Sequence, residues 1–162
     1  MATQAQLTTT WVQRVGGGEP QIEIYPEAAS QSFKAGQLVY LVGGKVTVCA
    51  NNAQVVLGIA NQDATTATDA DIQVIVLDNQ DILTCSVYHS TAASAITAVA
   101  QVGEDYELLV SSNKCYCDIE ATAVPLFRVV GIYDSPRYAV GDRYGLVKVR
   151  LMPAYCQTGT AG

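Results

Sequence analysis

The sequence predicts an all-β protein, a compact β-barrel or sandwich with one short helix and an extended N-terminal arm. Three observations lead to this prediction. Short runs of Val, Ile, Leu and Tyr recur along the chain, separated by turn residues at roughly 8–15-residue intervals, as in sandwiches and barrels. Two of these runs flank Gly43-Gly44, a two-residue hairpin signal. A single segment, 90–100, is rich in alanine instead of β-branched residues.

The N-terminal 32 residues differ from the rest of the chain. Thr and Gln without a regular period dominate residues 3–13, and Gly16-Gly17-Gly18 interrupts any regular element. The alternating stretch Gln21–Tyr25 lies between two prolines, a position typical of an edge strand. We therefore expect an arm over 1–32 that becomes an edge strand near Ile22–Tyr25, a β-barrel or sandwich domain over 33–152, and a C-terminal tail over 153–162.

From residue 33 onward, strands and turns are expected to alternate. The first hairpin joins 38–42 to 46–49 across the two glycines. Further strands are expected at 55–60, 72–77, 82–87, 106–110, 114–119, 126–133 and 144–151. The run at 72–77 is almost continuously apolar, which predicts burial on both faces. The alanine-rich segment opens with Ser90 and Thr91, either of which can cap a helix, and it predicts the one short helix.

Charge and composition limit the classes of function. A chain of 162 residues suffices for one domain whose core needs neither metal nor disulfides. The net charge is −6, and no stretch gathers Lys or Arg, so we expect no nucleic-acid partner, because such a protein needs a basic surface. The N-terminus lacks the pattern of a secretory signal, and no apolar run approaches the ~20 residues that cross a bilayer. We therefore expect no membrane partner.

The five cysteines form no pattern typical of a zinc site or a disulfide framework. An odd number without a secretion signal argues against disulfides. Cys115 and Cys117 are two residues apart in an expected strand, so both thiols should point to the same face. The favoured interpretation is that the cysteines are small apolar core side chains, with a metal site and a redox role as alternatives. The five are Cys49, Cys85, Cys115, Cys117 and Cys156.

The remaining polar candidates do not form a catalytic pattern. His89, the only histidine, has Ser86 and Ser90 nearby, but no nucleophile-elbow motif surrounds either serine, so we interpret it as a surface side chain. Two acidic clusters lack the order of a calcium loop and are interpreted as solvated loops, with a structural cation as the alternative. They are Asp63, Asp69 and Asp71, and Asp78 and Asp81. We expect no catalytic residue, no metal, no cofactor and no enzymatic activity.

The arm contains the best candidates for contact with a partner. Trp11, the only tryptophan, either folds back on its own domain or anchors the arm on a neighbouring subunit. The sequence leaves both interpretations open. The candidate partner-binding residues are the apolar ones of the arm: Leu7, Trp11, Val12, Ile22, Ile24 and Tyr25.

Three stretches of the β-region share turn glycines flanked by β-branched strands. They are Phe33-Lys34-Ala35-Gly36-Gln37-Leu38-Val39 through Gly44-Lys45-Val46 to Gly58-Ile59-Ala60, Val102-Gly103-Glu104-Asp105-Tyr106-Glu107-Leu108 with Tyr116-Cys117-Asp118, and Gly131-Ile132-Tyr133-Asp134 with Val140-Gly141-Asp142-Arg143-Tyr144. Together they resemble the head decoration, or capsid cement, proteins of tailed bacteriophages, over roughly residues 33–151.

This resemblance implies a small domain of jelly-roll or β-tulip type that forms homotrimers on the outer capsid surface of a virion. Each trimer would clamp subunits of the major capsid protein after the shell expands, and the arm would reach along the shell. The expected function is thus that of a structural protein, assembled in the host cytoplasm, that stabilises the expanded head. The alternatives are another phage structural protein, such as a tail-tube or head-fibre protein, and a carbohydrate-binding β-domain.

Overall fold

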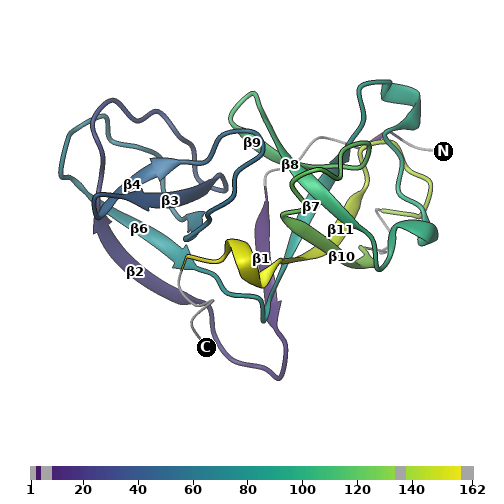
Figure 1. Cartoon of the computed structure of the whole chain (residues 1–162), viewed down its shortest axis with the longest axis horizontal. Coiled ribbons are helices and arrows are strands. Elements are labelled where there is room, and N and C mark those ends of the chain that lie inside the picture. Colours follow the sequence, from purple (N-terminus) through teal and green to yellow (C-terminus); the bar gives the residue numbers. More distant parts are fainter. Residues whose placement is uncertain (1–2, 5–8, 134–137, 158–162) are drawn as a thin grey trace.

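The structure, a computed structural model, describes residues 3–4, 9–133 and 138–157. The protein is all-β, as the sequence predicts, with 46% of its residues in strands and 6% in helical turns. The strands form two sheets that lie side by side (Figure 1). No helix of the described residues is long and apolar enough to span a membrane.

The larger sheet contains a closed barrel. Its order is β1 (Thr10–Arg14), β7 (Asp81–Tyr88), β11 (Leu146–Leu151), β10 (Phe127–Ile132), β8 (Asp105–Ser111) and β9 (Lys114–Asp118). The last strand, β9, also pairs in parallel with the end of β7, which closes five strands into a mixed barrel. β1 occupies the same edge of β7 as β9, but pairs antiparallel with its first half.

The smaller sheet has five antiparallel strands and curls until its two edges meet at one end. Its order is β2 (Gln21–Pro26), β6 (Asp71–Val76), β5 (Gly58–Ala60), β3 (Leu38–Val42) and β4 (Lys45–Val48). A parallel bridge between Glu27 and Val46 joins the segment after β2 to β4. The rest of β2 has no strand on its outer side among the described residues.

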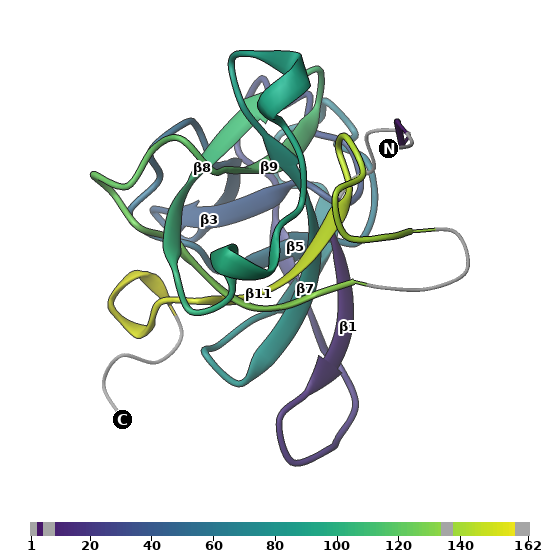
Figure 2. The same ribbon diagram turned by 90° about the vertical axis from the view of Figure 1, so that its right-hand side faces the viewer.

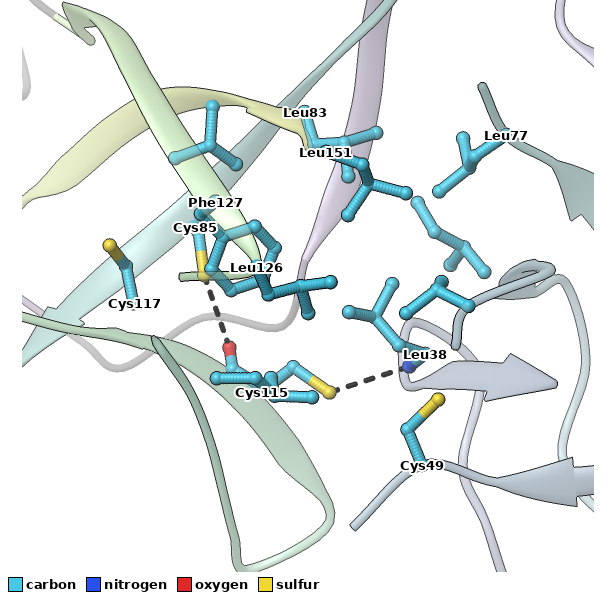
Figure 3. Close-up of a cluster of buried hydrophobic side chains, with 14 of the residues drawn as sticks. Leu38, Cys49, Leu77, Leu83, Cys85, Cys115, Cys117, Leu126, Phe127 and Leu151 are labelled. Atoms are coloured by element: carbon cyan, nitrogen blue, oxygen red, sulfur yellow. Dashed lines mark hydrogen bonds between the residues drawn. The ribbon is translucent and has the colours of Figure 1, made fainter. Parts of the chain in front are cut away.

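The main core fills the barrel and continues onto the facing side of the smaller sheet. Phe127 and Leu83 lie inside the barrel, and Leu38 and Leu77 reach the same cluster from the other sheet (Figure 3). A second core lies inside the curled sheet around Phe33. The two sheets therefore share one apolar interface and are not separate units.

Strand β6 supplies side chains to both cores, because successive residues of a strand point to opposite faces. Val74 belongs to the second core, whereas Ile75 packs against the main core. Gln73, however, is exposed. The prediction that 72–77 is buried on both faces is therefore correct at Ile75 and wrong at Gln73. Gln73 lies toward the outer end of the sheet.

Strand β1 was not predicted from the sequence, because its polar residues give no alternating apolar pattern. Thr10 and Gln13 are exposed, and the register shifts between Trp11 and Gln13, which breaks the alternation that indicates a strand. A hydrogen bond between the hydroxyls of Thr10 and Thr84 (2.5 Å) joins β1 to β7. The residues of the expected arm thus add one strand to each sheet: β2 is the edge strand expected near Ile22–Tyr25, whereas β1 was not expected.

The single helix expected in 90–100 is replaced by two 3-10 turns, η1 (Ala92–Ser94) and η2 (Val99–Gln101). Between them, Ile96 forms a bridge with Arg143, and the Thr97 amide donates to the carbonyl of Asp142 (3.3 Å). These tertiary hydrogen bonds use the backbone groups that a continuous helix would need, so they override the helix propensity of alanine.

The C-terminal segment extends the smaller sheet beside β3. After the 3-10 turn η3 (Pro153–Tyr155), Cys156 forms a parallel bridge with Val56. The amide side chain of Gln157 then accepts from the Leu41 N–H (2.8 Å) and donates to its carbonyl (3.0 Å). This side chain covers backbone groups of β3 that the short β5 does not reach.

Candidate interaction surface

Strand β2 carries the most exposed of the predicted partner-binding residues. The side chains of Ile22 and Ile24 are 51% and 60% exposed. Both lie on the sheet face of Ile75, opposite to the face of Tyr25, because Ile22 pairs with Ile75 and the residues alternate along the strand. They extend the apolar face that packs on the barrel, but they lie beyond the part that the barrel covers.

The hydrogen-bond register decides which backbone groups of β2 are free. The carbonyl of Gln73 in β6 accepts a hydrogen bond from the Asn61 amide, just after β5. The Leu77 amide donates to the carbonyl of Leu57, just before β5. Odd-numbered residues of β6 therefore bond toward β5. Its even-numbered residues therefore bond toward β2, to positions 21, 23 and 25. Ile22 and Ile24 consequently direct their N–H and C=O groups away from the sheet.

The continuation of β2 agrees with this register. The Glu27 amide donates inward to the carbonyl of Ala70 (2.8 Å), whereas the Ala28 amide donates outward to the carbonyl of Val46 (3.1 Å). Even-numbered positions thus face the outer edge, and β4 satisfies only the last of them. No backbone hydrogen bond within the described residues reaches Ile22 or Ile24 on this edge.

Tyr25, the third candidate on β2, belongs to the interior of its own sheet. Its ring is half-buried against the second core, and its hydroxyl donates to the carboxylate of Glu23. This hydrogen bond, with partial burial and the charge of Glu23, raises the pKa of Tyr25 to about 12.

Trp11 and Val12 lie on β1, in the other sheet, and are half-buried. The indole N–H of Trp11 donates to the Asp81 carboxylate (2.9 Å), and its ring packs against the main core. Trp11 thus makes the contacts expected if it folds back on its own domain. Leu7 lies outside the described residues.

An ion-pair cluster fixes β1 beside the turn between β6 and β7. Arg14 contacts the carboxylates of Asp78 (2.8 Å) and Asp81 (3.4 Å). Burial raises the pKa of Asp78, but hydrogen bonds from Arg14 and from the Gln80 amide lower it by more, to below its ordinary value. This acidic cluster therefore neutralises an arginine of the same chain.

The candidates on β1 and β2 are therefore not brought together in one site. The glycine loop between the strands separates them and projects from the molecule (Figures 1 and 2). Sequence reasoning missed six other exposed large apolar residues of the described part of the chain, because the hydrophobic pattern alone does not separate them from core positions. They are Val15, Val42, Val55, Val99, Val102 and Val140.

All five cysteines are buried free thiols, as the favoured interpretation predicts. Cys115 and Cys117 lie in the main core, where the Cys115 sulfur accepts from the Leu38 amide (3.4 Å) (Figure 3). Burial raises the pKa of every one of these thiols, to about 11 for Cys115 and about 11 for Cys156. They stay protonated at neutral pH and are poor nucleophiles. No cluster of at least three His, Cys, Asp or Glu within the described part of the chain could hold a metal ion.

His89 takes part in a polar contact between loops. Its Nδ1 lies 3.1 Å from Glu120 and accepts from the Thr91 amide (3.0 Å). The Ser90 hydroxyl donates to the Glu120 carboxylate (3.0 Å). This serine is hydrogen-bonded to an acid and not to the imidazole, so the order of groups needed to activate a nucleophile is not present here.

The outer face of the barrel has a hollow of about 410 Å³ between β1, β7 and β11. Trp11, Tyr133 and Tyr138 are among the residues that line it, together with Thr10 and Thr84. The two tyrosine rings meet edge to face, with their centroids 5.7 Å apart.

Comparison with known proteins places the chain in no group: no protein-family model and no curated protein matches it.

Proposed function

We propose that the protein is a bacteriophage capsid decoration protein, which binds the outer surface of the expanded head and stabilises the lattice of the major capsid protein. The observation that carries this proposal is the pattern of turn glycines through which the sequence resembles that family. Gly36, Gly43, Gly44 and Gly141 all adopt positive φ, between 57° and 94°. Other residues rarely adopt this conformation, so these four glycines are ones that this fold requires.

The surface chemistry supports a structural role. The described residues offer exposed isoleucine and valine side chains for contacts, while their thiols are buried. The net charge of −6 suits an outer surface that faces solvent and does not face packaged nucleic acid. A protein that binds only the expanded lattice stabilises that lattice by mass action, and repeated weak contacts over the shell add by multivalency.

The test is reconstitution on purified heads. The full chain is added to expanded heads that lack a decoration protein and, as a control, to unexpanded shells, and occupancy is measured by electron cryomicroscopy. We expect ordered density on expanded heads only, and a higher temperature of head disruption. A homotrimer in solution would show a mass three times the 17.2 kDa of the chain. Equal binding to both shells, or none to either, would contradict the proposal.

A carbohydrate-binding role is the second candidate, and the aromatic hollow favours it. Sugar rings pack their C–H faces on aromatic side chains, and hydroxyls such as those of Thr10 and Thr84 can hydrogen-bond to them. A glycan array distinguishes the two functions. A ligand whose binding is lost in Tyr138→Ala, but not in Tyr155→Ala, would favour this candidate over shell stabilisation.

A further inference from the structure

The outer edge of β2 combines two features that a docking strand needs. Its free N–H and C=O groups belong to Ile22 and Ile24, and the exposed side chains of the same two residues lie on one face. Strand addition uses such an edge: main-chain hydrogen bonds give affinity, and alternate side chains give specificity. Natural edge strands are usually blocked by a charge, a proline or a covering loop. Pro20 and Pro26 limit the open part of β2 at its two ends, so that Ile22 and Ile24 are the positions left for pairing.

The charge around this edge is acidic. Glu19, Glu23 and Asp71 are exposed and form no ion pair with any described residue. The two lysines of the smaller sheet and its loops are already used, since Lys34 contacts Asp63 (3.5 Å) and Lys45 contacts Asp69 (2.7 Å). The edge therefore presents negative charge at both ends and in the middle, and neither of these lysines is left to neutralise it.

We propose that β2 is a docking edge that takes up an extended basic segment of another protein as an additional strand. In such a strand, the residues opposite Ile22 and Ile24 share their face and would be apolar. The residue between them would lie on the other face, beside the Glu23 carboxylate, and would be Lys or Arg. The geometry thus specifies a segment in which apolar and basic residues alternate.

A second copy of this chain fits the edge less well. Antiparallel pairing of two β2 strands about a two-fold axis centred on Glu23 would bring the two Glu23 carboxylates opposite each other. Like charges directly opposite across a strand pair are destabilising. The added strand therefore comes from a partner with the opposite charge. This inference does not depend on the proposed capsid function, because it rests on the edge alone.

The test uses the full chain, labelled with ¹⁵N, and a blocked synthetic peptide in which valine and lysine alternate. At saturating peptide, amide hydrogen exchange should slow about tenfold at Ile22 and Ile24, whose N–H groups point outward. It should not change at Glu23, whose N–H already bonds to β6. Two control peptides accompany it: one with glutamate in place of lysine, and one with N-methylated valines, which cannot pair with the edge.

Two matched variants test the same geometry from the protein side. Ile24→Pro removes an outward N–H without breaking the bonds between β2 and β6, whereas Ile24→Ala keeps this N–H and shortens only the side chain. We expect Ile24→Pro to abolish binding and Ile24→Ala to weaken it. Glu23→Lys should reverse the preference between the lysine and glutamate peptides.

Each outcome bears on the proposal. Binding of the lysine peptide with protection at both isoleucines supports it, and the N-methylated peptide keeps the test valid if Ile24→Pro does not fold. Equal binding of all three peptides would overturn it, because backbone pairing and charge would then play no part. A concentration-dependent dimer that Ile24→Pro abolishes would identify a second copy as the occupant, and would overturn it too. Absence of binding at millimolar peptide has the same consequence.

Discussion

At the scale of single residues, burial decides what the cysteines can do. Cys115 and Cys117 are two residues apart in an exposed-looking polar hairpin, yet both are fully buried in the main core. The thiolate is the reactive form of cysteine, and burial in apolar surroundings disfavours it. The sequence alone indicates core thiols, but their packing against Leu38 of the other sheet depends on the tertiary arrangement.

The first prediction concerns these thiols. In the folded protein at pH 8, none of the five cysteines should react with iodoacetamide within minutes, because the pKa of each is raised by burial. All five should react in denaturant. Mass spectrometry counts the labels. Rapid labelling of Cys115 or Cys117 in the native state would contradict the burial described here.

Glu27 is a buried acid with a structural task. Its carboxylate is fully buried and accepts hydrogen bonds from the Thr65 amide (3.1 Å), the Thr65 hydroxyl and the Thr66 amide (3.1 Å). It thus fixes the acidic loop after β5 over the end of the curled sheet. Nothing in the local sequence indicates this role, because the loop lies nearly forty residues away along the chain.

The second prediction follows from Glu27. Glu27→Ala should lower the free energy of unfolding by about 3 kcal/mol, since it removes a buried carboxylate together with the three hydrogen bonds that this carboxylate accepts. Glu27→Gln, which keeps one carbonyl oxygen, should cost less. Urea denaturation measures both, with the exposed Glu19→Ala as a control that should change stability by less than about 0.5 kcal/mol. Equal effects of Glu27→Ala and Glu19→Ala would show that the loop does not depend on this carboxylate.

At the scale of elements, periodicity predicted the strands that are apolar on one face and missed the one that is held by polar contacts. The hairpin 38–42 with 46–49 corresponds closely to β3 and β4, because its glycines specify the turn. β1 carries Thr10 and Gln13 outward, and through Arg14 it depends on Asp78 and Asp81 from a distant turn. Such an attachment cannot be predicted without the tertiary structure. The same holds for the free edge of β2, which follows from its place in the sheet.

The third prediction concerns how pH acts on β1. The pKa of Asp78 is lowered in the folded protein, so its ion pair stabilises the fold above the unfolded-state pKa of 3.8 and loses this effect as pH falls through the folded value. Arg14→Ala should therefore reduce stability clearly at pH 7 and much less at about pH 2. The control is Lys148→Ala, which removes a charge from the same sheet but no ion pair of the described residues. Thermal unfolding followed by circular dichroism measures both, and a pH-independent effect of Arg14→Ala would argue against the ion pair.

At the scale of the whole molecule, the two sheets depend on each other through the shared core. The side chains of Leu38 and Leu77 project from the smaller sheet and pack among barrel side chains (Figure 3). The chain also crosses between the sheets, since β1 belongs to the larger and β2 to the smaller. We therefore expect the described part of the chain to unfold in one cooperative transition.

The fourth prediction uses truncation to separate the ends of the chain from the strands. A chain that begins at Thr9 keeps β1, and should unfold cooperatively near the wild-type temperature. A chain that begins at Gln21 loses β1, the Trp11 contact with Asp81 and the Arg14 ion pairs, and should lose several kcal/mol of stability. The unfolding of both chains is followed by circular dichroism and not by tryptophan fluorescence, because the chain that begins at Gln21 lacks the only tryptophan. Equal stability of the two chains would mean that β1 is dispensable.

The order in which the strands are made differs from the order in which they pair. β11 is the last strand of the described residues, yet it lies between β7 and β10 in the barrel wall. The barrel therefore cannot close during synthesis until the ribosome has released residue 151, and folding must wait for contacts between distant segments. A nascent chain that stalls before residue 146 would expose Leu83, Cys85 and Val87 of β7 to chaperones and proteases. Quality control in the cell would thus discriminate sharply between complete and incomplete copies of this protein.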